Sequence, residues 1–233
     1  MALLATVLTA LLNFQSSEAA QPTERRHDLD STQVDAVVTY IIDTTASELH
    51  VLVQRAGTLA RLGHNHIISA GHIEGTVTLR PEKSESVIQL TLPLREFVID
   101  DPNLRKAEGE GFTSIPSQKD IDGTRRNMVG PKLLDVANFP VVHVSGRGLL
   151  VDENGIATLE MTIQVKNTST LRRVPLDLTI RRDLITATGA IELSHEELGL
   201  KPFRVMFGAL QVASLMKVRF RVTARRAESS APN

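Results

Sequence analysis

The sequence predicts an all-β protein, a closed antiparallel β-barrel of about eight strands that carries a short helical insertion. Three observations support this fold class. Apolar and polar residues alternate with a period of two through much of 37–226, which is typical of strands buried on one face. Turn-forming residues separate the alternating runs at hairpin-like spacing. Antiparallel strands with one apolar face each must stack as two sheets or close into a barrel, and about eight strands leave room for one small ligand.

The N-terminal residues predict export. Residues 2–12 form an uncharged apolar run that is too short to span a bilayer, and Ser17 and Ala19 supply the small residues of a cleavage site. No Lys or Arg precedes the run, so the signal lacks one usual element. We therefore expect a periplasmic or secreted protein. The predicted parts are a signal peptide at 1–20, a linker at 21–36, a barrel domain at 37–226 and a tail at 227–233.

Composition narrows the function classes. The 233 residues are 42% hydrophobic and only 3% aromatic, so the core must consist mainly of aliphatic side chains. A net charge of −1 and the scarcity of aromatic rings argue against a nucleic-acid partner. The absence of Cys excludes disulfides, thiolate metal ligands and Cys nucleophiles.

Six alternating runs define the clearest strands, with turns at 80–82, 152–155 and 182–183. The apolar residues that share a face within each run are Leu49, Val51 and Val53; Val77 and Leu79; Ile88, Leu90 and Leu92; Leu159, Met161, Ile163 and Val165; Val174, Leu176, Leu178 and Ile180; and Met216, Val218, Phe220 and Val222.

A polar section at 100–134 interrupts the strands and is expected to lie across one end of the barrel as a lid. Within it, the sequence predicts a short helix over 118–128 with Ser117 as its N-cap. A second short helix is expected at 194–198, closed by Gly199. Asp100 and Asp101 are interpreted as solvated loop charges.

Four segments, taken in order, resemble the motifs of one known family. They are Tyr40–Leu49, Gly71–Leu79, Leu134–Pro140 and Ile191–Leu200. The family is the YceI-like family of lipocalin-like periplasmic barrels, which is associated with polyisoprenoid binding. The resemblance covers 37–225 and implies a lipocalin-like barrel with an isoprenoid ligand. The chain departs from the family pattern at 63–66 and at 124–128, so it resembles a divergent, His-containing branch.

The segment Gly-His-Asn-His at 63–66 is the strongest candidate for a site. In a strand, His64 and His66 would point the same way. Such a pair can bind a metal or haem, with His50, His72 or His143 as further ligands. It can also contact the polar head group of a ligand such as a quinone, or it can be purely structural.

The segment 124–128 is a second candidate, because the adjacent Arg125 and Arg126 beside Asn127 could hold a phosphate or carboxylate at the barrel mouth; a solvated helix face is the alternative. Five residues are expected to line a ligand cavity: Val51, Val53, Phe112, Leu176 and Leu178. Five Phe residues are expected mainly to pack in the core, although some of them could line the cavity, as Phe112 is expected to do: Phe97, Phe112, Phe139, Phe203 and Phe207.

The predicted function is an exported binding protein that holds an apolar or amphiphilic ligand, such as an isoprenoid- or quinone-like lipid, inside the barrel. The alternative is a metal- or haem-binding redox or stress protein that uses His64 and His66, and a membrane redox protein is a further candidate partner. We do not expect an enzyme, because the Gly-x-Ser-x-Gly and His-Glu-x-x-His motifs are absent.

Overall fold

The computed structural model describes residues 36–153 and 156–228. The predicted signal peptide, nearly all of the linker, the residues of the tail from 229 and the Asn154-Gly155 turn lie outside this part. The strands are β1 (Val38–Ile42), β2 (Glu48–Ala56), β3 (His66–Ser69), β4 (Glu74–Leu79), β5 (Val87–Pro93), β6 (Val98–Ile99), β7 (Val141–Val151), β8 (Ala157–Val165), β9 (Thr168–Ile180), β10 (Leu184–Ser194), β11 (Arg204–Val205) and β12 (Leu210–Arg226). The helices are α1 (Pro102–Glu108) and α2 (Gln118–Val129), and the short 3-10 turns include η1 (Thr44–Ala46), η2 (Ala60–Leu62), η4 (Leu94–Glu96) and η5 (Met206–Gly208).

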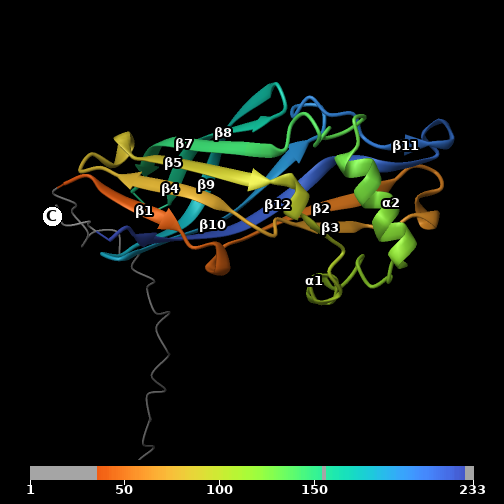
Figure 1. Cartoon of the computed structure of the whole chain (residues 1–233), viewed down its shortest axis with the longest axis horizontal. Coiled ribbons are helices and arrows are strands. Elements are labelled where there is room, and N and C mark those ends of the chain that lie inside the picture. The colour runs from red at the N-terminus through yellow and green to blue at the C-terminus, as the bar shows by residue number, and fades with distance from the viewer. Residues whose placement is uncertain (1–35, 154–155, 229–233) are drawn as a thin grey trace, which may run out of the picture.

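Eight strands close into an antiparallel barrel, which confirms the predicted fold class (Figure 1). The order around the wall is β1-β4-β5-β7-β8-β9-β10-β12, and β12 pairs with β1 to close the ring. Strands β7 to β10 pair with one another in chain order, and the predicted turn at 182–183 lies between β9 and β10.

In the other half of the wall, β1 and β2 together occupy the position of one long strand that is interrupted between them. Strands β1 and β2 both pair with β12, one after the other: Ile42 lies opposite Ala224, and Glu48 lies opposite Arg221. The interruption is η1, where the Asp43 N–H donates to the Thr223 carbonyl. Strand β2 then pairs with β3, and β3 pairs with β6, so these three strands continue the barrel at one end.

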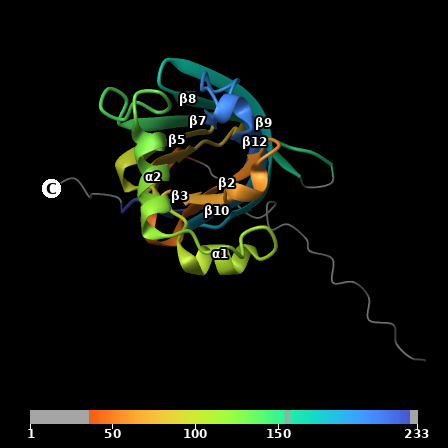
Figure 2. The same ribbon diagram turned by 90° about the vertical axis from the view of Figure 1, so that its right-hand side faces the viewer.

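Helix α2 lies at this end, beside the short strand β6 (Figures 1 and 2). No pairing joins β6 to β7 within the described residues, and α2 covers this part of the wall. The helix begins as predicted, since Ser117 and Asp120 form a reciprocal capping box. Met128 on its last turn is buried. The helix therefore closes one side of the barrel near this end, whereas the sequence predicted a lid across the end.

The second predicted helix is wrong. Residues 195–199 form hydrogen-bonded turns that follow β10, with Gly199 at a φ of 68°. The Leu200 N–H donates to the His195 carbonyl, so the chain reverses within a few residues instead of continuing as a helix.

The core lies inside the barrel and is formed by the apolar faces of the alternating strands. A separate small cluster of Leu52, Ile67 and Phe112 lies apart from this core, with Leu104 of α1 packed against it. The predicted core position of Phe207 is wrong, because its side chain is fully exposed. No helix in the described residues is long and apolar enough to cross a membrane.

Candidate functional site

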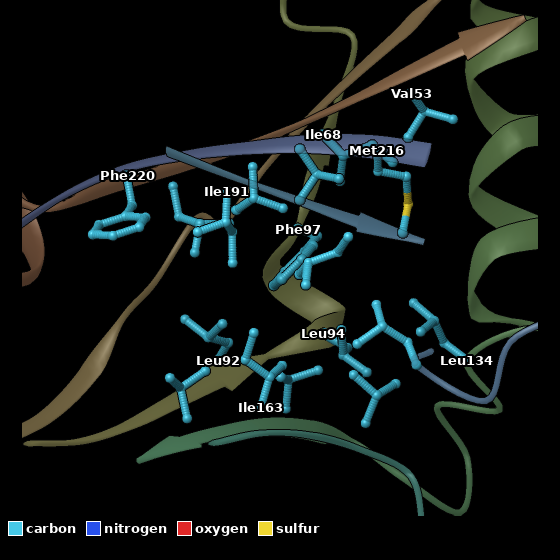
Figure 3. Close-up of a pocket in the computed structure, with 18 of the residues that line it drawn as sticks. Val53, Ile68, Leu92, Leu94, Phe97, Leu134, Ile163, Ile191, Met216 and Phe220 are labelled. Atoms are coloured by element: carbon cyan, nitrogen blue, oxygen red, sulfur yellow. The ribbon is translucent and has the colours of Figure 1, made fainter. Parts of the chain in front are cut away.

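A cavity of about 310 Å³ occupies the barrel interior. Figure 3 shows 18 of its lining side chains, whose non-hydrogen atoms are carbon apart from one Met sulfur. Four of the 35 lining residues are polar. None of the 35 is an Asp, Glu, Lys or Arg, so the two His residues are the lining residues that can carry a charge. The alternation explains this composition, because each strand directs its apolar face inward. The four polar lining residues are His66, Thr124, Asn127 and His195.

His66 is held by a buried ion pair. Its Nδ1 lies 2.6 Å from Asp100 Oδ2, and Asp100 Oδ1 lies 2.5 Å from Arg105 Nη1. Asp100 also accepts a hydrogen bond from the Ile67 N–H. A carboxylate only accepts hydrogen bonds, so Nδ1 of His66 carries the proton. Among the described residues Nε2 has no hydrogen-bond partner, and it is the ring nitrogen left for a ligand in the cavity.

Arg105 connects this pair to the neighbouring loop. Its guanidinium group donates to the carbonyls of Asn65 and Ser114 and to the Ser114 hydroxyl, and it lies 5.7 Å from the ring centroid of Phe112. Every strong donor direction of the guanidinium is therefore used, which is the usual condition for a buried Arg. The network holds His66 through its Nδ1 atom, and neither Asp100 nor Arg105 lines the cavity.

The interpretation of Asp100 as a solvated charge is wrong. Asp100 is 2% exposed and has a φ of 57°, a left-handed conformation that is costly for a residue with a side chain. Burial raises the pKa of Asp100, but the His66 and Ile67 hydrogen bonds and the Arg105 charge outweigh it and lower the pKa below its ordinary value. Asp101, the next residue, is the N-cap of α1 and accepts from the Asn103 and Leu104 N–H groups.

His195 is the second cavity imidazole. It is 4% exposed, and its Nδ1 donates to the Ser214 carbonyl at 3.0 Å, because a carbonyl can only accept. Like His66, it therefore has Nδ1 protonated and Nε2 left over. No sequence motif marks His195 as a cavity residue, and it reaches this position because it directly follows β10.

Five of the predicted site residues line the cavity, namely Val51, Val53, His66, Asn127 and Leu176. The other four do not. Leu178 is buried in the core without reaching the cavity, and Phe112 belongs to the separate cluster beside α1. Arg125 lies on α2, as does Asn127, but only Asn127 reaches the cavity.

His64 lies outside the strand that contains His66. Strand β3 begins at His66, so the two side chains do not share a strand face as expected. The ring centroids are 6.5 Å apart, and His64 Nδ1 lies 3.4 Å from the Ser114 hydroxyl. In the described part of the chain, no group of three or more His, Asp or Glu side chains could hold a metal ion.

The fold and the interior together define a class: a lipocalin-like antiparallel barrel that encloses an apolar cavity. Solved structures with a similar fold match this chain. BcnA from Burkholderia cenocepacia is 10% identical with a TM-score of 0.57, covering 78% of this chain and 98% of its own. A polyisoprenoid-binding domain from Saccharophagus degradans, described as implicated in plant cell wall breakdown, is 14% identical with a TM-score of 0.55, covering 82% and 99%.

The YceI protein of Campylobacter jejuni is also similar, at 7% identity and a TM-score of 0.49, covering 69% of this chain and 85% of its own. The first two similarities confirm the YceI-like fold that the sequence motifs implied. No protein-family model matches the chain, and no curated protein matches it in sequence.

Proposed function

We propose that this protein is an exported carrier that binds one isoprenoid- or quinone-like lipid, with the hydrocarbon chain inside the barrel. The apolar cavity carries this proposal, because 31 of its 35 lining residues are apolar. Each buried methylene of a ligand contributes about 0.8 kcal/mol, so a long chain would bind well without polar contacts. The polyisoprenoid-binding description of the Saccharophagus domain supports the ligand class, and the signal-like N-terminus supports export.

The polar group of the ligand would meet His66. Neutral imidazole with a protonated Nδ1 offers Nε2 as an acceptor, which suits the hydroxyl of an isoprenol or a quinol. Asn127 and Thr124 offer donors for a carbonyl. Among the described residues no Lys or Arg lines the cavity, so these residues would leave a buried phosphate or carboxylate without a counter-charge. The arrangement therefore favours a neutral head group, and a binding role in place of catalysis.

Native mass spectrometry tests this function. Delipidated protein is mixed with geranylgeraniol, with geranylgeranyl phosphate and with a plain hydrocarbon of similar length. We expect one molecule of the alcohol per chain, with weaker uptake of the phosphate. Replacing His66 by Phe should reduce the preference for the alcohol over the hydrocarbon by about tenfold, the value of one hydrogen bond.

Two variants make the test specific. Ala187 is the smallest lining side chain, so Ala187→Phe should fill the interior and block uptake of all three probes. Leu150→Asn changes an exposed residue and should leave uptake unchanged. Absence of uptake by the delipidated wild-type protein would exclude the carrier function.

A further inference from the structure

Two loops form a single tip at one end of the barrel. The first, residues 55–63, begins with the last two residues of β2 and contains η2, and the second, residues 201–212, contains β11, η5 and the first residues of β12. In Figure 1 this end lies beyond α2, at the opposite end from the labelled C-terminus. The Leu59 N–H donates to the Ala209 carbonyl, and a side chain at Gly57 would lie 2.4 Å from that oxygen. The loops are thus packed backbone to backbone, and we call residues 55–63 and 201–212 the barrel tip.

The barrel tip exposes large apolar side chains. Leu62 is 63% exposed, Met206 is 61% exposed and Phe207 is fully exposed. Met206 and Phe207 also have left-handed backbone conformations, with φ values of 51° and 58°. This conformation is unfavourable for both residue types, and its effect here is to project two large apolar side chains into solvent.

All formal charges at the barrel tip are positive. It contains Arg55, Arg61, Lys201 and Arg204, and its 21 residues include no Asp or Glu. Over the whole chain, acidic residues outnumber basic ones by 27 to 26, so the tip is unlike the average surface. Exposed apolar residues with surrounding cations match the interface of an anionic bilayer, where the apolar groups enter the headgroup boundary and the cations meet lipid phosphates.

The barrel tip is continuous with the cavity. Phe203 of the tip lines the cavity and is also 39% exposed. Val212 also lines the cavity, and on β12 it is the strand-pairing partner of Arg55 on β2. A lipid that leaves a membrane at the tip would therefore pass from one apolar environment to another without crossing water.

We propose that the barrel tip docks on anionic membranes, with Met206 and Phe207 inserted at the headgroup boundary and Arg61 and Arg204 against lipid phosphates. The exposed apolar side chains and the positive charge of the barrel tip support this proposal. It does not depend on which ligand the cavity holds. A bilayer is the occupant that accounts for both the apolar side chains and the charge excess, whereas a second copy of the tip would bring like charges together.

Vesicle flotation tests the docking. Vesicles of phosphatidylcholine with phosphatidylglycerol should carry the protein to the top of the gradient, and vesicles of phosphatidylcholine alone should do so less well. Phe207→Asn combined with Met206→Asn should weaken binding by at least about tenfold, since Asn tolerates the left-handed backbone and removes the apolar contact. Arg61→Gln with Arg204→Gln should weaken binding to the anionic vesicles and remove most of its dependence on salt.

Matched controls lie at the opposite end of the barrel. Leu150 is 64% exposed beside the β7–β8 connection, and Arg181 and Arg182 are exposed between β9 and β10. Leu150→Asn and the double change Arg181→Gln with Arg182→Gln should leave flotation unchanged. Thermal unfolding of every variant checks that the barrel is intact. The proposal is overturned if the wild type does not float with anionic vesicles, or if the control variants lose as much vesicle binding as the tip variants. It is also overturned if Phe207 supports a dimer and not vesicle binding.

The test is independent of the carrier function. Flotation uses protein without added ligand, so docking without lipid uptake would refute the carrier function and leave the docking surface. Uptake of geranylgeraniol from solution without flotation would support the carrier function and refute the docking surface.

Discussion

Asp100 and Arg105 place a charged pair beneath the cavity wall, where a barrel for apolar ligands would otherwise have aliphatic side chains. The pair is 0% and 5% exposed at its side chains. Such a pair is expensive to bury, and its effect here is to fix the orientation and the tautomer of His66. The strained backbone at Asp100 fits the same role, since it directs the carboxylate to His66 and Arg105 together.

Replacing Asp100 by Asn should lower the free energy of unfolding by about 3–5 kcal/mol, because Arg105 would remain buried without its counter-charge. Urea unfolding at neutral pH measures this change. Glu110→Gln removes an exposed carboxylate two residues beyond α1 and should change stability by no more than about 0.5 kcal/mol. Equal effects of the two substitutions would show that the ion pair does not stabilise the fold.

The lowered pKa of Asp100 also predicts a pH dependence. A carboxyl group with a lower pKa in the folded state stabilises the fold above its unfolded pKa of about 3.9, and this stabilisation is lost as the pH falls through the folded value. Stability of the wild type should therefore decrease below about pH 4, and Asp100→Asn should show a shallower decrease. Unfolding curves measured from neutral to strongly acidic pH test this, and parallel curves would contradict it.

At the scale of elements, α2 replaces part of the barrel wall. It carries Thr124, Asn127 and Met128 to the cavity, so its stability affects both the fold and access to the interior. The capping box at Ser117 and Asp120 is the main local feature that defines its first turn.

Ser117→Ala removes this cap and should cost about 1 kcal/mol, which corresponds to a decrease of about 2–4 °C in Tm for a domain of this size. Thermal unfolding followed by circular dichroism measures the change. Thr113→Ala, at an exposed position in the same loop, is the control and should leave Tm within error. A Tm for Ser117→Ala equal to that of the control would mean that the capping box is not needed.

The strands and the capped helix were predictable because their signals are local. Alternation over five to nine residues identifies a face, and Ser117 with Asp120 identifies a helix start. The His66–Asp100–Arg105 network was not predictable, because the first two residues are 34 apart in sequence and meet only through the pairing of β3 with β6. The order of β1 and β2 along β12 was hidden for the same reason.

At the scale of the whole molecule, the cavity couples ligand binding to stability. A ligand that binds only the folded barrel should stabilise it by about 2.7 kcal/mol at a concentration one hundred times its Kd. For this domain that corresponds to an increase of about 5–10 °C in Tm. Differential scanning calorimetry with geranylgeraniol measures the increase, and Ala187→Phe should abolish it. An increase that persists in Ala187→Phe would place the binding outside the cavity.

The pairing of β1 and β2 with β12 has a consequence for biosynthesis. The first two strands of the barrel find their partner in the last one, where Tyr40 lies opposite Arg226. The ring therefore stays open until the C-terminal strand has been translated, and the edges of β1 and β2 are exposed on the nascent chain. Contacts between such distant segments also slow folding. We expect the barrel to close only after β12 is available to pair with both β1 and β2.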